Sequence, residues 1–164
     1  MDLIARRRIV ATALRLRGIP YDHSHGDHSW KKLSVRPSSL DCSAFVARVS
    51  CKALGYDVGT LAADAKWLMK NLANVEGDRP ELGDIVGYCR NATPAEQQLV
   101  AGPLMRHVMI YVGNGVVVGA CDIAGGVVSR PIAYEPRLGA RCWIRVSTRH
   151  SPLAPYRRLE LRTT

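Results

Sequence analysis

The sequence predicts an α+β domain in which N-terminal helices pack on a central antiparallel sheet. Two observations support this prediction. Apolar residues recur at helical spacing in the first part of the chain, and β-branched runs joined by a hairpin turn follow in the second part. The length of 164 residues suits one domain with its own core. We expect residues 1–150 to form this single domain and residues 151–164 to form a basic C-terminal tail.

The first expected helix covers residues 2–17 and is amphipathic. Leu3, Val10 and Leu14 mark its apolar stripe, with Arg7 between them at the same phase and arginines over most of the remaining surface. A second helix begins near Cys42 and runs to about Leu54, where Gly55 is a plausible C-cap. A third helix is expected where leucines and an alanine recur at helical spacing, at Leu61, Ala65, Leu68 and Leu72.

The second part of the chain is expected to form short strands. The turn Gly113-Asn114-Gly115 joins two runs rich in valine, which is typical of a β-hairpin. The expected strands are residues 85–89, 107–112, 116–118, 127–128 and 141–146.

The charge balance favours an anionic partner. The formal net charge is +9, whereas aromatic residues make up only 6% of the chain. Basic and aromatic residues do not alternate as they do in single-strand binders, so we expect no nucleic-acid partner. No apolar run reaches membrane-spanning length, so we expect no membrane insertion, and the protein is expected to be a monomer.

The five cysteines include no C-x-x-C pair, so no zinc-ribbon site and no cofactor are expected. A loop cluster of His23, His25 and His28 could also be drawn as a zinc site, but substrate contact or surface exposure explains it more simply. The N-terminus lacks the uninterrupted apolar segment of a Sec-type signal. We therefore expect synthesis in the cytoplasm, with delivery by another machine if the protein acts elsewhere.

Cys42 is the candidate nucleophile. It follows Asp41, which is a good helix N-cap, and the start of a helix favours the thiolate form of a cysteine. A thiol hydrolase also needs an imidazole within reach and a third group that orients it. His107, at the start of a central strand, is the candidate general base and acid.

The hairpin register suggests the third group. If a three-residue turn makes Val112 pair with Val116, His107 pairs with Cys121 on the same face of the sheet. A slip of one residue would place Asp122 there instead. Both residues therefore remain candidates.

Four segments resemble motifs of the NlpC/P60 cysteine peptidases and occur in that family's order between residues 19 and 115. Residues 40–46 (LDCSAFV) resemble its D-C-S-G-F/L-V signature, and residues 19–21 resemble its upstream P-Y element. Residues 81–86 resemble its P-G-D-L-V turn, and residues 107–115 its H-V-G-I-Y-I-G-N-G hairpin.

The resemblance implies a papain-like α+β fold and a peptidoglycan hydrolase that cleaves the γ-D-glutamyl–diamino acid bond of stem peptides. It implies Cys42 as nucleophile, His107 as base and acid, and Tyr21 as a substrate or oxyanion contact. Beside these, we expect Asp41 to act mainly as the helix cap and secondarily to bind an amino group of the substrate, and Ser43 to be a further substrate-binding residue.

This sequence departs from the family's pattern in two places. Ala44 replaces a usual glycine, and Gly119 stands where the family often has a polar third catalytic residue.

Residues 120–127 also resemble a segment of type VI secretion amidase effectors, which supports Cys121 as the third residue. That branch implies an antibacterial toxin delivered to the periplasm or cell wall of a target cell, with an immunity protein as inhibitor. A phage-encoded lysin fits the same features. The remaining alternatives are an acyltransferase or amidase acting on another substrate with the same Cys-His pair, and a non-catalytic basic module that binds wall polymer or nucleic acid.

Overall fold

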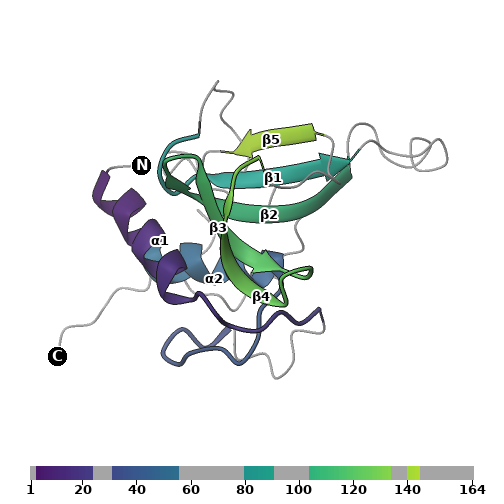
Figure 1. The fold of residues 1–164 in the computed structure, drawn as a ribbon. Helices are drawn as coiled ribbons and strands as arrows, with labels where there is room; N and C mark the ends of the chain where they lie inside the picture. The colour runs from purple at the N-terminus through teal and green to yellow at the C-terminus, as the bar shows by residue number, and fades with distance from the viewer. Residues whose placement is uncertain (1–2, 24–30, 56–79, 91–103, 134–139, 145–164) are drawn as a thin grey trace.

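The computed structural model describes residues 3–23, 31–55, 80–90, 104–133 and 140–144. They form two helices and a five-stranded antiparallel sheet with strand order β4-β3-β2-β1-β5 (Figure 1). The helices are α1 (Leu3–Arg15) and α2 (Cys42–Leu54). The strands are β1 (Ile85–Arg90), β2 (Leu104–Gly113), β3 (Val116–Cys121), β4 (Gly126–Pro131) and β5 (Ala140–Ile144).

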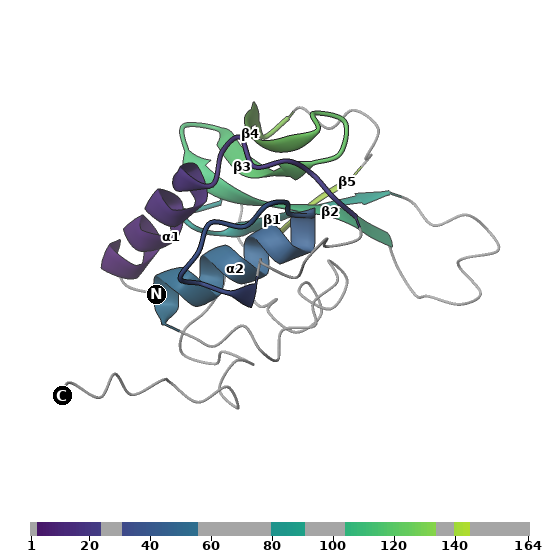
Figure 2. The same cartoon turned by 90° about the horizontal axis from the view of Figure 1, so that it is seen from below.

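Both helices lie on the same side of the sheet (Figure 2). Alternate residues of β2 lie on opposite faces of the sheet, because successive side chains of a strand point in opposite directions. Val108 and Ile110 pack against the helices, together with Phe45 of α2 and Ile9 of α1. Met109 packs on the opposite face of the sheet. The predicted α+β architecture, with N-terminal helices on an antiparallel sheet, is confirmed.

The predicted apolar stripe of α1 is not the face that packs in the core. The buried residues of this helix are Arg6, Ile9 and Ala13, whereas Leu3 and Leu14 are exposed. The reason is a long-range contact that local periodicity does not reveal.

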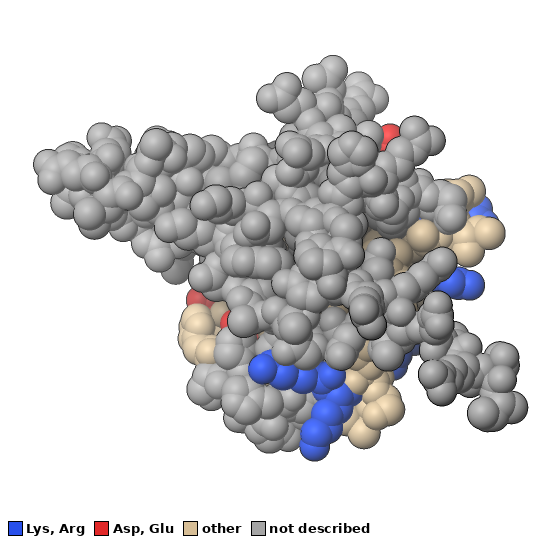
Figure 3. Space-filling view, turned by 180° about the vertical axis from the view of Figure 1, so that it is seen from behind, with Lys and Arg blue, Asp and Glu red and all other residues tan. Residues whose placement is uncertain are grey.

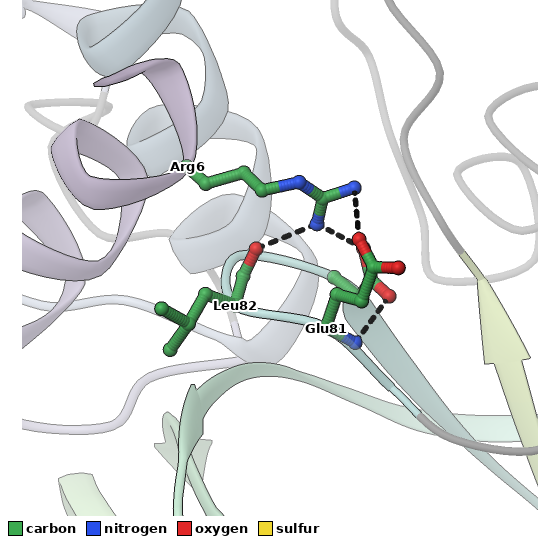
Figure 4. Close-up of polar contacts among 4 residues, drawn as sticks. Arg6, Glu81 and Leu82 are labelled. Atoms are coloured by element: carbon green, nitrogen blue, oxygen red, sulfur yellow. Dashed lines mark hydrogen bonds and ion pairs between the residues drawn. The ribbon is translucent and has the colours of Figure 1, made fainter. Parts of the chain in front are cut away.

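Arg6 reaches the turn before β1, where its guanidinium donates 2.7 Å to the carbonyl of Leu82 and 2.9 Å to the carboxylate of Asp84 (Figure 4). It also pairs with Glu81 at 3.0 Å. Because Asp84 is only 2% exposed, this pairing fixes which side of α1 faces inward.

The hairpin between β2 and β3 closes more tightly than predicted. Gly113, rather than Val112, is the partner of Val116, so the loop has the two residues Asn114 and Gly115. Both of these have positive φ, at 52° and 71°, as an Asn-Gly turn of the hairpin type requires.

An irregularity in the strand at Val112 absorbs the difference in length. Tyr111 then pairs with Val117, and Ile110 with Val118, in the predicted register. The predicted pairing of Val112 with Val116 is therefore wrong, but the register beyond the bulge is right.

Two predicted segments lie outside the described residues: the helix with Leu61 and Leu72, and the tail 151–164. Neither described helix is long and apolar enough to cross a membrane.

Candidate active site

Cys42 is the first residue of α2, as predicted. Asp41 caps the helix, because its carboxylate accepts 2.6 Å from the backbone N–H of Ala44 and 2.8 Å from the hydroxyl of Ser43. Gly55 ends the helix in the left-handed conformation, which is also as predicted. Local capping at both ends thus fixes the position of the thiol.

Burial is the main influence on the Cys42 thiol. It raises the pKa of Cys42 to about 12, and the negative charge of Asp41 acts in the same direction. Backbone N–H groups of Val108, Ser43 and Cys42 itself lower this pKa, but by less. The helix-start effect therefore acts in the expected direction, yet the neutral thiol is the favoured form in the free protein, against the sequence prediction.

The contact with the backbone N–H of Val108 places Cys42 beside β2, in which His107 is the residue before Val108. The His107 ring is 9% exposed and lies 5.9 Å from the ring of Tyr88. Its Nε2 is buried and has no hydrogen-bond partner in the described part of the chain.

Burial also keeps the His107 imidazole neutral. It lowers the pKa of His107 to about 4, although Asp122 and Asp41 raise it and Arg130 adds a smaller decrease. At neutral pH, the free protein therefore holds a neutral thiol and a neutral imidazole.

The position expected for a third catalytic residue is Gly119 of β3, and the side chain of Met109 from the neighbouring strand β2 fills the space beside it. A Cβ at Gly119 would lie 2.8 Å from Cγ of Met109, so no larger residue fits there without rearrangement. The pairing of β2 with β3 ends at Ile110 and Val118, so the predicted pairing of His107 with Cys121 follows only if this register is extended by three residues.

Cys121 is buried, whereas Asp122 is exposed and its carboxylate accepts 2.7 Å from the N–H of Ile123. Within the described residues, neither side chain makes a hydrogen bond to Nε2 of His107. Asp122 nevertheless influences His107 through its charge. The identity of the third group therefore stays a prediction.

Tyr21 lies beside Cys42, the predicted nucleophile, because its backbone is held on two sides. Its N–H donates 2.9 Å to Gly125, and a parallel bridge joins it to Leu40, two residues before Cys42. The pKa of Tyr21 is raised first by burial and then by nearby negative charge. The groups that supply this charge are Cys42, Asp41, Asp122 and Cys121. The hydroxyl thus lies among the predicted site residues and remains protonated.

Two further residues lie near Tyr21: His23, for which substrate contact or surface exposure was predicted, and Gly126, which was not predicted to shape the site. His23 lies in a T-shaped contact with Tyr21, with ring centroids 4.9 Å apart and the hydroxyl 3.4 Å from Nδ1. Gly126 bridges to Pro20, and a Cβ there would lie 2.6 Å from the carbonyl of Ile19. The adjacent glycines 125 and 126 were the signal in the sequence for this close backbone approach.

No cluster of three or more metal-ligating side chains occurs among the residues that the structure describes. His25 and His28 of the predicted histidine cluster lie outside them. Chemically, the described site offers a thiol, a neutral imidazole, a protonated phenol and helix-start amides, a set suited to acyl transfer.

Neither the protein-family models nor the curated proteins contain a match to this chain. Solved structures do match. NlpC1 from Trichomonas vaginalis aligns with a TM-score of 0.63 and 19% identity, over 88% of this chain and 45% of its own. This chain therefore spans less than half of that protein.

Two proteins from Mycobacterium tuberculosis also match. The peptidoglycan hydrolase RipB aligns with a TM-score of 0.57 and 21% identity, over 87% of this chain and 64% of its own. RipD is described as a non-catalytic NlpC/p60 domain protein adapted to peptidoglycan binding. It aligns with a TM-score of 0.60 and 17% identity, over 87% of this chain and 98% of its own. The chain therefore has the NlpC/P60 fold that its four ordered motifs predict.

Proposed function

We propose that this protein is a peptidoglycan hydrolase of the NlpC/P60 family that cleaves the γ-D-glutamyl–diamino acid bond of stem peptides. The observation that carries the proposal is the position of Cys42: a capped helix start whose thiol lies near enough to the backbone N–H of Val108, the residue after His107, for that group to lower its pKa. The fold supports the same reading, because RipB, which shares it, is a peptidoglycan hydrolase.

In this mechanism His107 takes the proton of Cys42 as the sulfur attacks the amide carbonyl carbon. Because both groups are neutral in the free protein, proton transfer accompanies attack. The N–H of Cys42 stabilises the oxyanion of the tetrahedral intermediate. The carbon–nitrogen bond then breaks, the amine leaves with the proton from His107, and a thioester remains. Water, deprotonated by His107, hydrolyses the thioester to a free carboxylate and restores the thiol.

The positions of the nearby groups support the further roles that we propose for them. Tyr21 contacts substrate through its protonated hydroxyl, Ser43 contributes a further contact, and Asp41 binds a substrate amino group besides capping the helix. Cys121 or Asp122 orients His107: the support for Cys121 is the hairpin register extended beyond its last pair, Ile110 with Val118, and the support for Asp122 is its charge.

The biological setting that we propose is antibacterial. The protein acts as a toxin of the type VI secretion kind or as a lysin, reaches the periplasm or wall of a target cell, and meets an immunity protein as its inhibitor. The support is the resemblance of residues 120–127 to such effectors.

The test is digestion of purified sacculi followed by mass spectrometry of the released fragments. We expect cleaved stem peptides with a new carboxylate and amine from the unchanged protein, and none from Cys42→Ala. Cys51→Ala is the matched control, since Cys51 is another buried free thiol of the same helix. Equal digestion by Cys42→Ala would exclude the proposal, and ligated products would indicate an acyltransferase.

A second candidate function is non-catalytic binding of peptidoglycan, as described for RipD. The observation that favours it is the buried Nε2 of His107, which no group orients within the described residues. This candidate predicts that sacculi retain the protein in a pull-down while no fragment is released by the unchanged chain.

A further inference from the structure

The outer face of α1 has an unusual composition for a helix surface exposed to water. It consists of Leu3, Ile4 and Leu14 with three exposed arginines, Arg7, Arg8 and Arg15. A solvated helix face normally carries charges of both signs that pair along the helix. Here the apolar side chains are 38–66% exposed, although the opposite face of the helix already supplies its core contacts.

The neighbouring loop continues this character. Arg36 donates from its guanidinium to the carbonyls of Arg15 and Arg17, at 3.0 and 3.1 Å, and so holds the loop against the end of α1. Val35, next to it, is 47% exposed, and Lys32 is exposed as well. Four of the five large hydrophobic side chains that are exposed in the described residues therefore lie on α1 and this loop.

The elements of this face contain no acidic residue, since segments 3–17, 31–40 and 42–55 have neither Asp nor Glu. Two acidic residues that adjoin them are engaged elsewhere: Asp41 caps α2, and Glu81 pairs with the buried Arg6. Figure 3 shows Lys and Arg side chains gathered along the lower and right-hand edges of the face seen from behind. The surface thus combines uncompensated positive charge with exposed aliphatic side chains.

We propose that the outer face of α1 and the adjoining loop bind the surface of an anionic lipid bilayer. The arginines pair with lipid phosphates, and the aliphatic side chains enter the boundary between headgroups and acyl chains. This is contact with one leaflet, and it needs no spanning segment. The inference does not depend on the reaction proposed above, because none of these residues belongs to the candidate active site.

The same observations argue against other partners. A hydrated polyanion would pair with the arginines but would leave Ile4 and Leu14 in water. Stacking of nucleic-acid bases needs exposed aromatic side chains, and the one aromatic residue in segments 3–17, 31–40 and 42–55 is Phe45, which is buried. A second copy of the face would bring like charges together.

The test is co-sedimentation with vesicles of phosphatidylcholine, with and without phosphatidylglycerol. We expect binding to the anionic vesicles only, and weaker binding as salt rises. Arg8→Gln/Arg15→Gln removes two charges, and Ile4→Gln/Leu14→Gln removes the apolar contribution. Each double variant should weaken binding by about tenfold or more.

Matched controls separate this face from general properties of the chain. Ile123→Gln changes the fifth exposed hydrophobic residue, and Arg157→Gln/Arg158→Gln removes two charges from the tail. Both controls should bind anionic vesicles as the unchanged protein does. An unchanged thermal midpoint shows that a variant is folded. If the variant Ile4→Gln/Leu14→Gln does not fold, Leu3→Gln is tested in its place.

Four results would overturn the proposal. They are absence of binding to anionic vesicles, equal binding to neutral vesicles, binding by the folded apolar variant that equals the unchanged protein, and an equal loss in the tail control. Binding to inorganic polyphosphate without binding to vesicles would overturn it as well, and would indicate a soluble polyanion instead.

Discussion

Gly119 of β3 and Met109 of β2 share one packing space on the sheet face away from the helices. A Cβ at residue 119 would lie 2.8 Å from Cγ of Met109 and 3.1 Å from its Cβ. Met109 is fully buried, so its side chain has little room to move. The glycine at the position where the sequence comparison led us to expect a polar third residue is thus packed against Met109.

Replacing Gly119 with alanine should therefore destabilise the fold. We expect Gly119→Ala to lower the free energy of unfolding by about 1–3 kcal/mol, because the added methyl overpacks a full space. In a Met109→Ala background the same change should cost less, by at least about 1 kcal/mol. Urea denaturation of the four proteins in this cycle measures the coupling.

Gly125→Ala is the control for this cycle. Gly125 has a φ of +69°, but a Cβ there would meet no atom within 4 Å. Its cost of about 1 kcal/mol should come from backbone strain alone, and Met109→Ala should leave it unchanged. Additive behaviour of Gly119→Ala with Met109→Ala would show that the two residues do not share space.

The raised pKa of Cys42 predicts how its alkylation depends on pH. Since the pKa is about 12, the thiolate fraction should rise about tenfold per pH unit from pH 7 to beyond pH 9, with no plateau near the usual thiol pKa. The measurement is the rate of iodoacetamide labelling at Cys42, read by peptide mass spectrometry. A plateau below pH 9 would show that the free protein holds a thiolate.

Asp41→Asn should speed this labelling at a fixed pH. The charge of Asp41 raises the pKa of Cys42, so its removal lowers that pKa and increases the thiolate fraction. Asparagine keeps the N-cap, so the helix start should remain in place. Ser39→Ala, which changes a neutral residue outside the cap contacts, should leave the rate unchanged.

How much could be predicted from the sequence depended on how local each determinant is. The start of α2 at Cys42 was predictable because Asp41 and Gly55 act within a few residues of the helix ends. The strands of the hairpin were predictable for the same reason. Its two-residue turn was missed because the flanking Gly113 suggested a longer loop, whereas Gly113 pairs with Val116.

The missed features depend on distant contacts. Arg6 lies inside because it meets Asp84, 78 residues away, and no periodicity in α1 encodes that partner. The favoured protonation states of Cys42 and His107 depend mainly on burial, which the assembled core determines. The sequence shows that residue 119 is a glycine, but it does not show that the Met109 side chain fills the space beside it.

Arg6 should be one of the costliest polar residues to replace. Arg6→Met leaves Asp84 buried without its guanidinium partner, and we expect a loss of about 3–5 kcal/mol in the free energy of unfolding. Arg7→Met, at the adjacent exposed position, should change it by about 0.5 kcal/mol or less. Urea denaturation of both variants checks the difference. Equal, small effects would show that the contact between α1 and the β1 turn is not needed for stability.

Finally, the lowered pKa of His107 predicts a specific loss of stability in mild acid. In the unfolded chain, histidine takes a proton near pH 6.5, whereas the folded His107 does so only near pH 4. Between these values the unfolded state binds more protons, so stability falls as the pH decreases from about 6.5 to about 4. Above this pH range His107 does not lower the free energy of unfolding. Across the range, the free energy of unfolding falls by about 3 kcal/mol because of this residue.

His107→Gln isolates this contribution, because glutamine does not titrate. Chemical denaturation at a series of pH values should show a shallower decline for His107→Gln than for the unchanged protein between pH 6.5 and pH 4. Asp122→Asn should act in the opposite direction, since the charge of Asp122 raises the pKa of folded His107 and its loss widens the gap to the unfolded value. Parallel curves for the unchanged protein and His107→Gln would mean that this imidazole takes up its proton as readily when folded as when unfolded.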